Sequence, residues 1–177
     1  MAVLKVAVSE ADHVQGPPSA EITLVEYGDY ECPHCGRAYP IVKRLQRHFG
    51  ERLQFVFRNF PLGEMHPHAE GAAEATEFCG SQGKFWEMHD LIYENQERLS
   101  GPLYLELAQR IGVAPAALRA SLEKREFLAR VRADFTGGVR SGVNGTPTFF
   151  ISGQRHDDAF DYEELAAAIE SASRAKP

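Results

Sequence analysis

Two cysteines with two residues between them, Cys32 and Cys35, are the residues of this sequence best suited to chemistry. They stand in the stretch Cys-Pro-His-Cys, in which Pro33 and His34 separate the two thiols. Such a pair can alternate between dithiol and disulfide, or it can supply two thiolates to a metal ion. The neighbouring residues and the rest of the chain are needed to decide between a redox pair and a metal site.

A strand is predicted directly before the pair and a helix directly after it. Residues 22–28 alternate and are rich in β-branched side chains, whereas apolar residues follow Pro33 at helical spacing as far as Gly50. A second strand is predicted at residues 53–57, so that the start of the chain forms a β-α-β unit. Proline is favoured at the first position of a helix, which places Cys32 at the N-cap.

The start of a helix favours a thiolate at Cys32, because the N–H groups there are unpaired and the dipole is positive. The dipole contributes about 0.3–1 kcal/mol, which is less than the ~1.4 kcal/mol of one pKa unit. His34 and direct N–H donation must therefore add to it, while the charges of Asp29 and Glu31 oppose it. We expect Cys32 to be exposed and nucleophilic, and Cys35 to be shielded one turn into the helix.

Two further features bear on the pair. Glu26 alternates with the apolar residues of the first predicted strand, so it is either a buried acceptor for the Cys35 proton or an edge-strand glutamate that reaches solvent. Thr146 and Pro147 precede a predicted strand at residues 148–152, and a cis bond between them would explain the turn at that point.

The middle of the chain is different from its ends. Residues 66–141 contain no convincing strand and indicate successive helices broken at glycine and proline. A final helix is predicted to begin near Asp161. We therefore expect one domain made of residues 1–62 and 142–177, and an inserted helical domain at residues 63–141.

Four stretches in this order resemble the DsbA-like branch of the thioredoxin superfamily: DYECPHC, FVFRNFPL, QGKFWEMHD and GVNGTPTFF. The resemblance implies an α/β thioredoxin fold with an inserted all-helical subdomain, and thiol–disulfide oxidoreductase activity without an organic cofactor. It implies that Cys32 is the nucleophile, Cys35 the resolving cysteine and Glu26 the buried acid. It also implies that Thr146 and Pro147 form the cis-proline loop that holds the substrate backbone.

Two positions depart from the DsbA pattern and leave the direction of exchange open. The residue before the first cysteine is Glu31 where DsbA has an aromatic residue, and the residue before the cis-proline is Thr146 where DsbA has valine. The substrates implied are protein or low-molecular-weight thiols and disulfides, together with an unidentified redox partner that recycles the pair.

Other functions compete with this interpretation. His66 and His68 can complete a Cys₂His₂ metal site with the cysteine pair, but residues two apart do not share a helix face, so we expect no physiological metal. A chaperone-like module that does not turn the pair over is a third possibility. Cys79 fits a small buried residue, and Arg58 is predicted to be a solvated charge at a strand end.

Composition limits the remaining classes of protein. The 177 residues fit about one domain with an insertion, and 44% hydrophobic with 25% charged residues is ordinary for a globular protein. A net charge of −6 disfavours nucleic acid as a partner, and no apolar run approaches the ~18 residues of a membrane span. The first residues lack the pattern of a signal peptide, which predicts a cytoplasmic protein, or a periplasmic one if the natural chain starts earlier.

Overall fold

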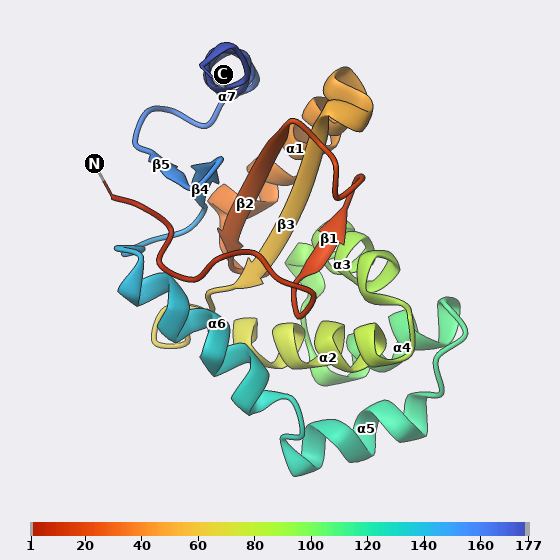
Figure 1. The fold of residues 1–177 in the computed structure, drawn as a ribbon. Coiled ribbons are helices and arrows are strands. Elements are labelled where there is room, and N and C mark those ends of the chain that lie inside the picture. The colour runs from red at the N-terminus through yellow and green to blue at the C-terminus, as the bar shows by residue number, and fades with distance from the viewer. Residues whose placement is uncertain (1, 176–177) are drawn as a thin grey trace. The chain divides into compact units, whose positions relative to one another are not determined.

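The computed structural model describes residues 2–175. It is a mixed α/β structure built on one five-stranded sheet (Figure 1). The order of the strands across the sheet is β1-β3-β2-β4-β5. The strands are β1 (His13–Gln15), β2 (Ile22–Gly28), β3 (Leu53–Asn59), β4 (Thr148–Ile151) and β5 (Gln154–His156). The predicted strands at residues 22–28, 53–57 and 148–152 are confirmed within two residues at each end, whereas β1 and β5 were not predicted.

Helices fill the rest of the chain, and most of them lie between β3 and β4 in sequence. They are α1 (Pro33–Phe49), α2 (Ala69–Ser81), α3 (Phe85–Glu94), α4 (Gly101–Arg110), α5 (Pro115–Lys124), α6 (Leu128–Arg140) and α7 (Tyr162–Arg174), with short 3₁₀ helices η1 (Gly50–Arg52) and η2 (Gln96–Arg98). The predicted helical stretch in the middle of the chain is therefore confirmed. In the part of the chain that the structure describes, no helix is long and apolar enough to cross a membrane.

The described chain divides into two compact units. The sheet unit comprises Met1–Gly28, Arg37–Arg58 and Thr136–Pro177. The helical unit comprises Asp29–Gly36 and Asn59–Phe135, so it contains the Cys-Pro-His-Cys motif as well as the helices of the insert.

Within the sheet unit, the core is built on the central strands. β2 and β4 are antiparallel, with Glu26 opposite Phe149 and Leu24 opposite Ile151. α7 contacts both strands and begins as predicted, since the Asp161 side chain accepts a hydrogen bond of 3.1 Å from the N–H of Glu164. β1 pairs with β3 along the other edge over three residues, which is too short a segment for an alternating pattern to reveal it.

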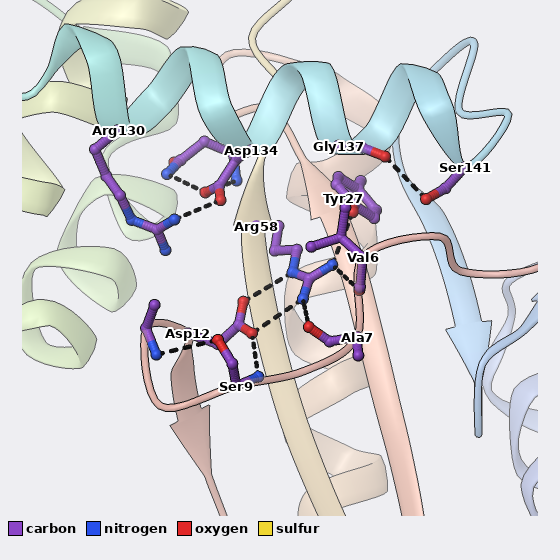
Figure 2. Close-up of polar contacts among 12 residues, drawn as sticks. Val6, Ala7, Ser9, Asp12, Tyr27, Arg58, Arg130, Asp134, Gly137 and Ser141 are labelled. Carbon is purple, nitrogen blue, oxygen red and sulfur yellow. Dashed lines mark hydrogen bonds and ion pairs between the residues drawn. The ribbon is translucent and has the colours of Figure 1, made fainter.

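Arg58 corrects one expectation, because it is buried rather than solvated, with 3% of its surface exposed. Its Nε and one Nη donate to the carboxylate of Asp12 at 2.8 and 2.9 Å (Figure 2). Its other N–H groups donate to the carbonyls of Val6 and Ala7 and to the Tyr27 hydroxyl at 2.9–3.1 Å. All five guanidinium donors are thus used to hold the N-terminal segment against the end of β3.

The helical unit is held together by contacts among α2, α3, α4 and α5, which Figure 1 shows in colours from yellow-green to blue-green. A buried polar cluster ties the end of β3 to the first half of α6. Asn59 donates from its backbone N–H and its side chain to Asp134 at 3.0 and 3.1 Å. Arg130 donates to the same carboxylate at 2.8 Å (Figure 2). Burial raises the pKa of Asp134 to about 6, although Arg130 and Asn59 act against that rise.

Candidate active site

The cysteine pair occupies the first turn of α1. The helix begins at Pro33, so Cys32 stands at the capping position as predicted, and the Cys32 carbonyl accepts a hydrogen bond of 3.0 Å from the N–H of Gly36. Cys35 is fully buried, and Cys32 is only 4% exposed. The prediction that Cys32 is exposed is therefore wrong, because it considered the helix end alone and not the segments that cover it. Pro33 and His34, between the two, are exposed.

Asp29 organises the turn between β2 and α1. Its side chain is completely buried, and one carboxylate oxygen accepts hydrogen bonds from the N–H groups of Glu31 at 2.8 Å and Cys32 at 3.1 Å. The N–H of Asp29 points to the Cys35 Sγ at 3.4 Å. A single residue therefore fixes the backbone before one cysteine and donates to the sulfur of the other.

The second oxygen of Asp29 reaches the loop after β3. It accepts hydrogen bonds of 2.8 Å from the N–H of Leu62 and from Nδ1 of His66. A buried carboxylate that accepts four N–H groups has the partners that its burial requires. The loop from Leu62 to His66 is consequently attached to the redox motif, although it is far from it in sequence.

Negative charge gathers around His66. Partial burial lowers the pKa of its imidazole, but the hydrogen bond and the charge of Asp29 raise it. The nearby Cys32 and Glu31 raise it further, so the net pKa lies above the ordinary value of histidine. The imidazole therefore gains proton affinity from the same residues that surround the cysteine pair.

Glu31 makes a separate contact with the start of α2. Its carboxylate accepts hydrogen bonds from the N–H of His68 at 2.6 Å and from the His68 Nδ1 at 2.9 Å. The Tyr104 hydroxyl donates to the carbonyl of His68 at 3.0 Å. The two histidines weighed as metal ligands thus each bind a different carboxylate, and residues 2–175 contain no group of three or more potential metal ligands.

Gln96, in η2, also holds the backbone of the motif in place. Its Nε2 donates to the carbonyls of Tyr30 at 2.9 Å and Cys32 at 2.8 Å. Its amide lies directly against Gly36, where an added Cβ would come within 2.9 Å of the Gln96 Cδ. Only glycine at this position leaves room for the Gln96 amide where it lies.

Aromatic packing anchors Tyr30, two residues before the first cysteine. Its hydroxyl is hydrogen-bonded to Nδ1 of His89 at 3.0 Å, and its ring packs against Tyr93 with centroids 5.0 Å apart. His89 is itself surrounded by the rings of Phe85 and Trp86 on α3. The backbone that carries Cys32 is therefore attached to the core of the helical unit.

The other predicted site residues belong to the sheet unit. Glu26 lies in β2 and is buried, with 3% exposure, as the buried-acid interpretation requires. The peptide bond between Thr146 and Pro147 is cis, which confirms the prediction, and both residues are half-buried directly before β4. The roles of these three residues in exchange stay predictions.

Sequence reasoning missed the organising roles of Asp29, His66 and Gln96. Asp29 was considered only as a charge that opposes a thiolate, and its spacing of three residues before Cys32 was the available signal for a capping carboxylate. Gln96 carried no comparable signal, because its contacts depend on how the insert folds back on the motif.

Comparison with known proteins identifies the family. The family model described as Thioredoxin matches residues 8–171. BdbD from Bacillus subtilis, in its oxidised form, superposes with a TM-score of 0.89 at 26% identity, covering 98% of this chain and 99% of that one. A thioredoxin-like oxidoreductase from Silicibacter pomeroyi gives 0.79 at 27% identity, covering 95% of each chain. Wolbachia pipientis α-DsbA1, at 16% identity and a TM-score of 0.82, covering 97% of this chain and 94% of that one, shares the fold.

Curated relatives are longer proteins. The Na(+)/H(+) antiporter NhaA 1 of Salinispora arenicola is 44% identical over 163 residues, which are 92% of this chain and 25% of the relative. NhaA 1 of Mycobacterium sp. (strain KMS) is 39% identical over 164 residues, 92% of this chain and 27% of the relative. The chain thus spans about a quarter of the length of these relatives. Family, fold and paired thiols agree: the chain belongs to the thioredoxin family and is a DsbA-like thiol–disulfide oxidoreductase whose redox pair is Cys32 and Cys35.

Proposed function

We propose that this protein exchanges disulfides with protein thiols through its Cys-Pro-His-Cys motif. The observation that supports this most strongly is the position of Cys32 at the start of α1, with Cys35 one turn further on and held by the N–H of Asp29. A helix start supplies unpaired N–H groups and positive potential, both of which favour a thiolate.

In the oxidising direction, a substrate thiolate attacks the Cys32 Sγ of the intramolecular disulfide and forms a mixed disulfide. Cys35 leaves as a thiolate and takes up a proton. A second substrate thiolate then attacks the substrate sulfur of the mixed disulfide, which releases an oxidised substrate and the Cys32 thiolate. In the reducing direction Cys32 attacks a substrate disulfide, and Cys35 resolves the mixed disulfide.

We assign the supporting roles from the family resemblance. Glu26, buried in β2, moves the proton of Cys35, since carboxyl groups act as general acids and bases. Thr146 and Pro147 hold the backbone of the substrate beside the reacting sulfur. Pro33 and His34 adjust the stability of the Cys32 thiolate and thereby the reduction potential of the pair.

The test is turnover of a protein disulfide such as insulin by the wild-type chain and by Cys32→Ala. The proposal predicts that the variant loses at least about 100-fold in rate, because no thiolate remains to attack. The reduction potential gives the direction: a value near about −120 mV indicates an oxidant, and one near about −270 mV a reductant. Retention of full turnover by Cys32→Ala would refute the proposal.

We also propose that the protein acts close to a membrane. The supporting observation is its 44% and 39% identity to proteins named as Na(+)/H(+) antiporters, whose length exceeds that of this chain about fourfold. Accessible thiols of a membrane transporter are then suitable substrates. The cytoplasmic location predicted from sequence stays a prediction. Labelling with a membrane-impermeant thiol reagent tests it by comparing intact with permeabilised cells. Labelling of Cys32 only after permeabilisation supports the cytoplasm, and equal labelling of intact cells contradicts it.

A further inference from the structure

The imidazole of His66 is connected to the redox motif through the carboxylate of Asp29. One oxygen of Asp29 accepts the N–H of Cys32 at 3.1 Å, and the other accepts Nδ1 of His66 at 2.8 Å. The Asp29 side chain is 0% exposed and that of His66 is 14% exposed, so little water screens the contact. A titratable ring on a loop outside the motif is therefore linked through the Asp29 carboxylate to the backbone of Cys32.

The charges that face His66 come from three parts of the helical unit. Asp29 and Glu31 lie in the turn before α1, and Cys32 lies at the start of that helix. His68, at the start of α2, is bound to Glu31. The negative charges raise the pKa of the His66 imidazole against the lowering effect of its burial.

One of these charges depends on the redox state. Cys32 carries a negative charge only when the pair is reduced and the thiol is ionised, and a disulfide carries none. Interaction between two charges is reciprocal, so a cationic His66 stabilises the Cys32 thiolate as much as the thiolate stabilises the cation. Nδ1 is occupied by its hydrogen bond to Asp29, which leaves Nε2 as the atom that binds and releases the proton.

We propose that His66 is a positioning residue of the redox centre that takes up a proton at Nε2 when the Cys32–Cys35 disulfide is reduced, and releases it on oxidation. The inference rests on the proposed exchange function. With glutathione as reductant, the disulfide and two glutathione thiols give the Cys32 thiolate, the Cys35 thiol, oxidised glutathione and one proton. His66 retains this proton, so the charge created at Cys32 is balanced beside it.

The pair of His68 and Glu31, which joins the start of α2 to the turn before α1, provides a matched control. It has a similar hydrogen bond, 2.9 Å from Nδ1 to the carboxylate, but its side chains are 49% and 21% exposed. Solvent screens such a pair, so its electrostatic interaction with Cys32 is weak. Asparagine at either position keeps a donor near the place of Nδ1 and removes the imidazole ring.

The experiment measures the equilibrium constant of the pair with glutathione from about pH 5.5 to 8, around the ordinary histidine pKa of ~6.5. Without proton uptake at His66, one proton is released per reduction and the constant rises about tenfold per pH unit, or ~30 mV. We expect that slope in His66→Asn above pH ~6.5. The wild-type chain and His68→Asn should both show a clearly smaller slope.

Equal slopes in the wild-type chain and His66→Asn would overturn the inference alone, as would a His68→Asn slope that matches His66→Asn. A wild-type pair that never equilibrates with glutathione would overturn the proposed function and this inference with it. A second measurement needs no variant: NMR titration of the His66 ring in both redox states. A higher pKa in the reduced state supports the inference, and identical values overturn it.

Discussion

Replacement of Asp29 by asparagine removes a buried charge from the active site while keeping the size of the side chain. The two carboxylate oxygens accept four N–H groups at 2.8–3.1 Å, two on each oxygen. Asparagine has one acceptor oxygen, so two of the four donors lose their partner and face an NH₂ group instead.

A hydrogen bond to a charged group contributes about 1.5–3 kcal/mol, so the loss of two predicts that Asp29→Asn lowers the free energy of unfolding by about 3–6 kcal/mol. A typical domain has about 5–15 kcal/mol in total, so this loss is a large share of the stability. Urea unfolding followed by circular dichroism should show a midpoint lowered by roughly 1.5–3 M, for a slope of about 2 kcal/mol per M in the middle of the range for small proteins.

Glu31→Gln is the matched control. Glu31 also accepts two hydrogen bonds, both from His68, but the pair is partly exposed to solvent. We expect this variant to lose less than about 1 kcal/mol. A loss below about 1 kcal/mol in Asp29→Asn, or equal losses in the two variants, would refute the reasoning that burial makes Asp29 the organiser of the turn.

Three further predictions concern the surrounding structure. Arg58→Met removes the buried ion pair with Asp12 and should lower the free energy of unfolding by about 3–5 kcal/mol. Much of this loss should be regained with Asp12→Asn in a double-mutant cycle. Burial raises the pKa of Asp134 from 3.8 to about 6, so its stabilising contribution is complete below pH 3.8 and is lost as pH rises through about 6. Wild-type stability should therefore fall by up to about 3 kcal/mol relative to Asp134→Asn between about pH 4 and 7, measured by urea unfolding, and parallel pH profiles would contradict this. Gly36→Ala displaces the Gln96 amide that holds the Cys32 carbonyl and should lower the free energy of unfolding by about 1–3 kcal/mol. Gly71→Ala is the control, because its Cβ meets only an ordinary contact at 3.5 Å. It should raise the free energy of unfolding by about 0.5–1 kcal/mol, measured by thermal unfolding.

Local sequence signals predicted the elements that carry the reacting groups. The strand at residues 22–28 matches β2 because its alternation of β-branched residues is a property of that segment alone. Proline after Cys32 located the first residue of α1, and the burial of Cys79 followed from its helical spacing with small residues. Burial also raises the pKa of the Cys79 thiol to about 12, so this cysteine carries little thiolate.

The remaining features depend on contacts between segments that are distant in sequence. The burial of Asp29 follows from the approach of Leu62 and His66, whose loop geometry is not encoded near the motif. Arg58 was interpreted as a solvated charge because its acceptors lie in the N-terminal segment, where the sequence shows no pairing pattern. Charged residues are mostly exposed, and a buried one is identified only when all of its partners are placed.

The central claim is that Cys32 attacks and Cys35 resolves, and trapping of the mixed disulfide tests it most directly. Reduced Cys35→Ser and Cys32→Ser proteins are incubated with oxidised glutathione, and the adducts are located by peptide mass spectrometry. The account predicts a stable glutathione adduct on Cys32 in Cys35→Ser and little adduct in Cys32→Ser, in which the buried Cys79 serves as an internal control. Equal modification of the two variants, or an adduct on Cys79 before Cys32, would contradict it.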